Sequence, residues 1–239
     1  MKEPDKAEMQ ELVENLKELR NRFAVAILAV GLASIIVVFV FGSRIIPFMI
    51  HYFLPKGTKV IALSPIEYIY SIFLISVVIG IYVATPVIIY EIFKFAEPGL
   101  YPNEKNLFVR IVPSSFILLT MGLLFSFFVV IPPSTKFLVF YTQETAEPML
   151  VLSRFVSAIG VMILSIGMIF QLPLVIAFLV KAKLVTVSWL KHRRRYMYAI
   201  LLAIGFFFSP DPTPITPMII ALTLVFIFEL SLIFAEHLL

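Results

Sequence analysis

Residues 23–43 read FAVAILAVGLASIIVVFVFGS, a run of twenty-one residues without one charged side chain. A helix rises about 1.5 Å per residue, so this run can cross a hydrocarbon core of roughly 30 Å. Three further uncharged runs follow, at 68–90, 111–135 and 155–180. These stretches predict membrane-spanning helices, and they decide the fold class.

The composition leads to the same class of protein. Of the 239 residues, 61% are hydrophobic and 14% are charged, and the charged fraction is about half that of soluble domains. The mean hydropathy is +1.02. A soluble domain cannot bury so much apolar surface, and the runs lack the alternation of a membrane β-barrel. The sequence predicts an all-α, polytopic membrane protein with a single domain over residues 1–239.

The segment from residue 196 to residue 235 predicts two short spans, 196–210 and 213–235, rather than one long helix. Four prolines lie close together in this segment, at Pro210, Pro212, Pro214 and Pro217. Prolines at that density end a helix. The first of these spans has fifteen residues and rises only about 22 Å, so its outer end lies below the membrane surface or the bilayer thins there. With the four longer runs, the predicted number of spans is six.

The distribution of Lys and Arg predicts the orientation. Six spans place both termini on one side, and fourteen of the nineteen basic residues then fall on that side. Cytoplasmic loops carry the excess of Lys and Arg, so both termini are predicted to be cytoplasmic. The run KHRRR at 191–195 is interpreted as a topology anchor rather than a nucleic-acid site. The external segments, about 44–67 and 136–154, are expected to lie along the interface as short helices or caps.

The N-terminal segment, residues 1–22, is predicted to form an amphipathic helix that runs into the first span. Apolar residues recur at steps of three and four within AEMQELVENLKELRNRF, residues 7–23. One interpretation is an interfacial anchor. The other is a helix that docks a partner, with specificity from charged side chains that include Glu18, Arg20 and Arg22.

The segment between the second and third spans reads EIFKFAEPGLYPNEKNLFVR, residues 91–110. Exposed carboxylates such as Glu97 and Glu104, near the ring of Phe95, can bind a guanidinium by bidentate pairing and by contact with an aromatic face. The alternative is a solvated loop whose charges only set the topology.

Three polar residues in or between the later spans are candidates for contacts with a partner or a transported chain. Gln171 lies deep in the fourth span, where it either meets a partner or forms an interhelical hydrogen bond. Glu229 lies inside the sixth span or snorkels from its cytoplasmic end. Asp211, in the external hairpin, either caps the last helix or makes a functional contact.

Several chemistries have no pattern in this sequence. There is no cysteine, the three histidines are far apart, and no phosphate-binding glycine loop is present. We therefore expect no metal, no cofactor and no enzymatic activity. A secondary transporter is the competing class, and it requires polar groups that converge at the membrane midplane.

Taken in order, six motifs resemble the C subunit of the twin-arginine protein translocase, the Sec-independent export system. They are LKELRNRF (16–23), SPIEYIY (64–70), FKFAEPGLYPNEK (93–105), FVVIPPSTKF (128–137), FQLPLVI (170–176) and FFFSPDPTPITP (206–217). They are distributed along nearly the whole chain. The chain departs from the family at two places: the family usually has His-Leu where this chain has Asn15-Leu16, and Thr-Pro-Pro-Asp in the hairpin that here contains Asp211. Gln171 agrees with the family, which has Glu or Gln at that position.

The resemblance implies a receptor in the inner membrane of a bacterium or archaeon rather than in a thylakoid. Folded proteins with a twin-arginine signal peptide would dock on its cytoplasmic face, through Glu18, Arg20, Phe95, Glu97 and Glu104. Single-span A-type and B-type subunits would assemble with it, around Gln171, Asp211 and Glu229. The resemblance also implies transport driven by the proton-motive force and allows self-association in the receptor complex.

Overall fold

The computed structural model describes residues 6–96, 105–143, 147, 149–181, 183–207 and 215–238, and most of them are helical. The elements are α1 (Lys6–Phe53), β1 (Lys59–Ile61), α2 (Pro65–Ala96), α3 (Lys105–Phe125), the π-helix η3 (Ser126–Val130), α4 (Ile131–Gln143), β2 (Met149–Val151), α5 (Leu152–Ile169), α6 (Leu172–Lys181), α7 (Val187–His192), α8 (Arg194–Phe207) and α9 (Ile215–Leu238). The predicted all-α class is confirmed.

Five stretches of the described helices are long and apolar enough to cross a membrane. They are Val13–Phe53, Pro65–Phe95, Val112–Gln143, Leu152–Lys181 and Thr216–Ile233. Their outer faces carry bare apolar side chains, such as Phe39 with 85% of its surface exposed, as helices that face lipid do. The predicted span 196–210 corresponds to α8, which has 14 residues and is shorter than the other five. Its crossing of the membrane stays a prediction.

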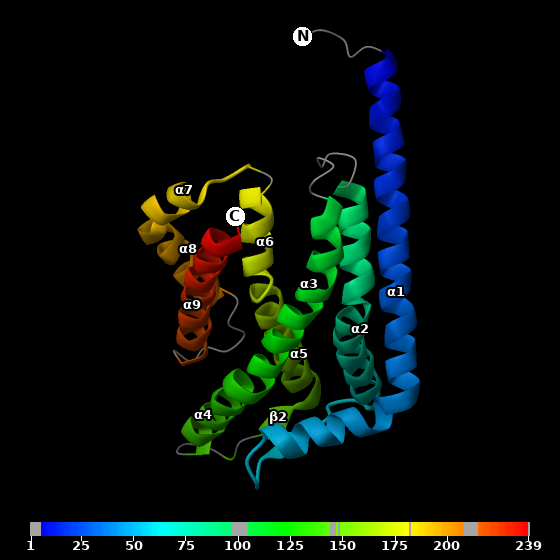
Figure 1. The fold of residues 1–239 in the computed structure, drawn as a ribbon. Coiled ribbons are helices and arrows are strands. Elements are labelled where there is room, and N and C mark those ends of the chain that lie inside the picture. Colours follow the sequence, from blue (N-terminus) through cyan, green and yellow to red (C-terminus); the bar gives the residue numbers. More distant parts are fainter. Residues whose placement is uncertain are drawn as a thin grey trace.

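Helix α1 joins the predicted N-terminal helix and the first span without a break. Figure 1 shows it extending beyond the rest of the bundle at its N-terminal end and bending near its other end, where the last part runs across the bundle. Pro47 lies near this end of the helix, six positions before its last residue, Phe53. Because proline has no N–H and clashes with the preceding turn, it accounts for a bend there.

The end of the bundle opposite the N-terminus is tied together by a short parallel sheet. Strand β1 pairs with β2 from Lys59 opposite Met149 to Ile61 opposite Val151. Beside it, the carboxylate of Glu67 accepts hydrogen bonds from the backbone N–H of Leu63, at 2.6 Å, and of Ser153, at 2.9 Å. The strand pairing was not predicted, because two three-residue strands have no periodicity to recognise.

The fourth predicted span, 155–180, is a single candidate span but not a single helix. Helix α5 ends at Ile169 and α6 begins at Leu172, so Phe170 and Gln171 form a non-helical step between them. Pro173 cannot donate a hydrogen bond to the carbonyl of Ile169, which favours a break at this place. The predicted span is therefore one candidate crossing of the membrane that consists of two helices.

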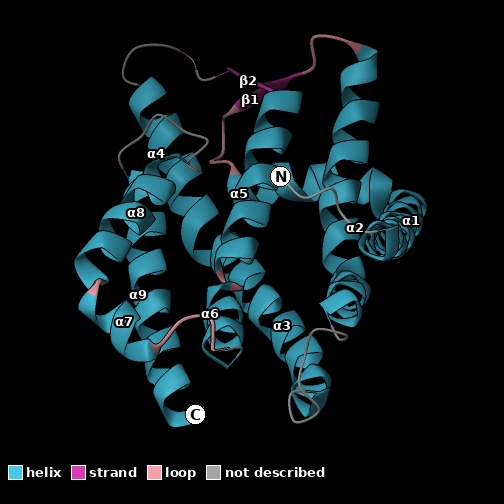
Figure 2. Cartoon of the chain, turned by 90° about the horizontal axis from the view of Figure 1, so that it is seen from above, coloured by secondary structure: helices cyan, strands magenta, loops and turns pink. Residues whose placement is uncertain are grey.

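The helices pack around two buried apolar clusters. One joins α1, α2 and α5 around Ile46, Val156 and Ile159, and the other joins α5, α6, α8 and α9. Figure 2 shows the pair α1 and α2 on one side and the group α7, α8 and α9 on the other, with α3, α5 and α6 between them. Small residues permit close approach of backbones within membranes. A Cβ on Gly80, for example, would lie 2.9 Å from the backbone nitrogen of Ser34.

Candidate functional site

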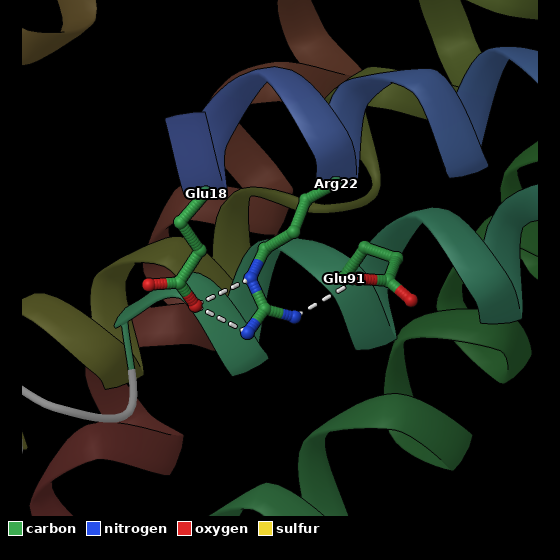
Figure 3. Close-up of polar contacts among 3 residues, drawn as sticks. All are labelled: Glu18, Arg22 and Glu91. Atoms are coloured by element: carbon green, nitrogen blue, oxygen red, sulfur yellow. Dashed lines mark hydrogen bonds and ion pairs between the residues drawn. The ribbon is translucent and has the colours of Figure 1, made fainter. Parts of the chain in front are cut away.

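A charged cluster joins α1 and α2 at the end of the bundle that carries the N-terminus. Glu18 and Arg22 are one helical turn apart on α1, a spacing at which side chains meet. The Nε of Arg22 donates to Glu18 at 2.9 Å, and its Nη2 donates to the same oxygen. Its Nη1 donates to Glu91 of α2 at 3.0 Å, as Figure 3 shows. One guanidinium therefore bridges carboxylates that are 73 residues apart in the sequence.

The burial of the three side chains differs. Arg22 and Glu91 keep 17% and 16% of their side-chain surface exposed, whereas Glu18 keeps 39%. Water screens a pair between exposed charges, and partial burial reduces that screening. The contact between Arg22 and Glu91 is therefore the better shielded of the two, and Glu18 is the carboxylate more accessible to a ligand.

An open cavity of about 550 Å³ lies beside this cluster. Its lining is Glu14, Asn15, Glu18, Asn21, Arg22, Val25 and Glu91. The lining holds three carboxylates and one guanidinium, which leaves a surplus of two negative charges. Two amide side chains add hydrogen-bond donors and acceptors. Such a cavity suits a cationic ligand that forms several hydrogen bonds.

Of the residues predicted to bind the signal peptide that the structure describes, only Glu18 lines this cavity. Glu18 lies in the cavity wall, whereas Arg20 is exposed, and its Nη2 donates to Asn21 at 3.4 Å. Phe95, near the end of α2, is 37% exposed. Glu97 and Glu104 lie outside the described residues.

The sequence analysis named Arg22 among the charged side chains of a docking helix, but it did not predict its pairing with Glu18 and did not assign Glu91 to this site. The spacing of four residues between Glu18 and Arg22 could have indicated their pairing. The partner on α2 had no such signal, because its approach depends on how α1 and α2 pack.

Gln171 has a partner inside the protein. Its Nε2 donates to the backbone carbonyl of Ser115 at 3.0 Å, and its Oε1 accepts from the hydroxyl of Ser115 at 2.9 Å. The interhelical alternative considered for this residue thus has a definite form, a two-point link between α3 and the step between α5 and α6.

Glu229 is held at the interface of α8 and α9. Tyr198 donates to one of its carboxylate oxygens, and Nη2 of Arg194 lies 3.0 Å from the other. The side chain is 30% exposed. Asp211 lies outside the described residues. Among the described residues, no group of three or more His, Asp or Glu side chains is arranged to hold a metal ion.

Comparisons with known proteins agree over most of the chain. The family model for the Sec-independent protein translocase protein (TatC) matches residues 14–222. A TatC of Methanocella arvoryzae is 32% identical over 95% of this chain and 94% of its own length. A TatC of Aquifex aeolicus is 33% identical over 92% of both chains. A crystal structure of the twin-arginine translocase receptor TatC superposes with a TM-score of 0.81 and 31% identity, over 92% of this chain and 99% of that one.

The long apolar helices and the matching fold define an integral membrane component of a protein-export system. The chain belongs to the TatC family and is a component of the Sec-independent protein translocase. The resemblance found in its six motifs is thereby confirmed.

Proposed function

We propose that this chain is the receptor that binds twin-arginine signal peptides of folded cargo, and that the cavity between α1 and α2 is part of the binding site. The observation that carries the proposal is the surplus of two negative charges in the cavity lining. A pair of arginines brings two positive charges, and each guanidinium can pair with a carboxylate through two parallel hydrogen bonds.

The chain course supports a site that extends beyond the described residues. Glu91 precedes the last residue of α2, Ala96, by five positions, and α3 begins at Lys105. The helix ends that flank Glu97 and Glu104 in the sequence both lie at the end of the bundle where the cavity lies (Figure 1). We propose that these two carboxylates and the ring of Phe95 complete the site, with Arg20 at its exposed margin.

Peptide binding to the full chain in detergent or nanodiscs tests this proposal. A peptide with two arginines should bind more tightly than the same peptide with two lysines, because lysine is a point charge without the planar fork. Glu97→Gln or Glu104→Gln should weaken binding about tenfold to a hundredfold. Glu18→Gln should weaken it less, about threefold to tenfold, because this carboxylate is partly screened.

The control is Glu147→Gln, the same chemical change on a side chain that is 73% exposed and pairs with Lys59. Lys59 belongs to β1, which pairs with β2 at the opposite end of the bundle (Figure 1). The affinity of the Glu147→Gln variant for the peptide should equal that of the unmodified chain. Unchanged affinity in all three site variants would remove these carboxylates from the site and defeat the proposal.

The same proposal includes the partners of the receptor. Single-span A-type and B-type subunits would pack against α8 and α9, because a helix too short for the bilayer favours lateral association. Asp211, Gln171 and Glu229 would then lie in the region that the partners approach. The proton-motive force would drive transport, and the chain itself would catalyse no reaction.

A further inference from the structure

Arg22 already makes the contact that an arginine of a signal peptide would make. Its Nε and Nη2 both donate to Oε1 of Glu18, the more exposed of the two carboxylates that it bridges. A bound guanidinium cannot use that carboxylate fully while Arg22 does. The cavity lining thus already holds one guanidinium of its own chain against Glu18.

We propose that Arg22 is an internal guanidinium ligand that occupies Glu18 in the free receptor and releases it when a signal arginine binds. The inference rests on the proposed function, since it concerns the same carboxylate. It adds a residue that lowers the affinity of the site.

The second carboxylate makes this release feasible. Arg22 contacts Glu91 through Nη1, whereas it contacts Glu18 through Nε and Nη2. The bond to Glu91 can therefore persist when Glu18 is given up. This matters because Arg22 is 17% exposed, and a largely buried charge without any partner is strongly unfavourable. Glu91 lies on α2, so its position does not depend on the turn of α1 that binds the ligand.

An internal competitor has a definite thermodynamic signature. The apparent affinity of any ligand that needs Glu18 is reduced by the fraction of receptors in which this carboxylate is free. The reduction is the same for every such ligand. Arg22 therefore lowers the apparent affinity for every signal peptide that needs Glu18. It does not change the ratio of the affinities for the arginine and lysine peptides.

The test compares the full chain with its Arg22→Gln variant, using two signal peptides that differ only in having two arginines or two lysines. Removal of the competitor should tighten binding of both peptides by the same factor, about threefold to tenfold. The matched control is Lys17→Gln, which removes one positive charge from an exposed position on the same helix. It should change neither affinity by more than about twofold.

A second comparison uses Glu18→Gln in both backgrounds. If Arg22 and the ligand compete for this carboxylate, the double variant should bind like Glu18→Gln alone. The loss on replacing Glu18 is then larger in the Arg22→Gln background, about tenfold to a hundredfold. Equal losses in the two backgrounds would show that Arg22 does not compete, and would overturn the inference.

Three other results would also overturn it. They are unchanged or weaker binding by Arg22→Gln, a gain for only one of the two peptides, and a gain equal to that of Lys17→Gln. If Arg22→Gln does not fold, Arg22→Lys keeps the charge but loses the bidentate geometry. It should give a smaller gain of the same sign, and no gain would refute the competition. Failure of the proposed function looks different, because no carboxylate variant would then alter binding in either background.

Discussion

The link between Gln171 and Ser115 should stabilise the fold, and Gln171→Leu tests it directly. The amide both donates to and accepts from Ser115, whose side chain is fully buried on α3. Leucine has a similar volume but can form neither bond. The same region has little freedom to repack, because a Cβ on Gly122 would lie 3.0 Å from Gly167 and from Phe170.

The magnitude follows from the two hydrogen bonds that are lost. Interhelical hydrogen bonds in membrane proteins contribute about 0.6 kcal/mol on average and about 1.7 kcal/mol at most. The carbonyl of Ser115 loses only a second hydrogen bond, and its hydroxyl can turn to a backbone carbonyl one helical turn earlier. We therefore expect a loss of about 1 to 2 kcal/mol in the free energy of unfolding. This corresponds to a melting temperature lower by about 2–8 °C.

Thermal unfolding in detergent, followed by circular dichroism, measures this change. The control is Gln143→Leu, at the exposed end of α4, which should stay within about 0.5 kcal/mol of the unmodified chain. Ser115→Ala and the double variant complete a cycle, in which the second substitution should cost less once the first is present. Strictly additive losses, or a Gln171→Leu variant as stable as the control, would refute the proposed link. A variant with normal stability that fails in export would instead indicate a contact with a partner.

Three further changes test other parts of the structure. Gly80→Ala places a Cβ 2.2 Å from the hydroxyl of Ser34, so α1 and α2 must separate and the unfolding free energy should fall by about 1–3 kcal/mol. The control is Gly31→Ala, whose added Cβ would have nothing within 4 Å. Equal stability of the two variants would contradict this packing. Glu67→Gln removes the charge that accepts two hydrogen bonds from Ser153, so the melting temperature should fall, and no change would mean that this contact does not tie α2 to α5. Because the chain contains no cysteine, single cysteines along α8 and α9 can be cross-linked to an A-type subunit, and cross-links that form only along α1 to α3 would place the partner elsewhere.

The fold class and the family could both be predicted from the sequence without a structure. A run of about twenty residues without a charge indicates a segment that lies in the bilayer. A single segment there can satisfy the hydrogen bonds of its own backbone only as a helix, since strands require a closed barrel. The closely spaced prolines Pro210, Pro212 and Pro214 likewise predict a break, and α8 ends at Phe207 and α9 begins at Ile215, on either side of them. These are local properties, and each can be read without knowing what the segment contacts.

The contacts between polar side chains of different helices, in contrast, depend on the tertiary structure. Glu91 contacts Arg22 across 69 positions of sequence, and Gln171 contacts Ser115 across 56. Neither pair has a periodic pattern, because each distance depends on the crossing of two helices, which small residues such as Gly80 and Gly122 set through van der Waals contact. The periodicity of a helix specifies which of its residues share a face, whereas packing selects the face of the neighbouring helix that it meets. For this reason the pair of Glu18 and Arg22 could be suggested by its spacing on one helix, but Glu91, the second partner of that arginine, could be recognised only in the folded chain.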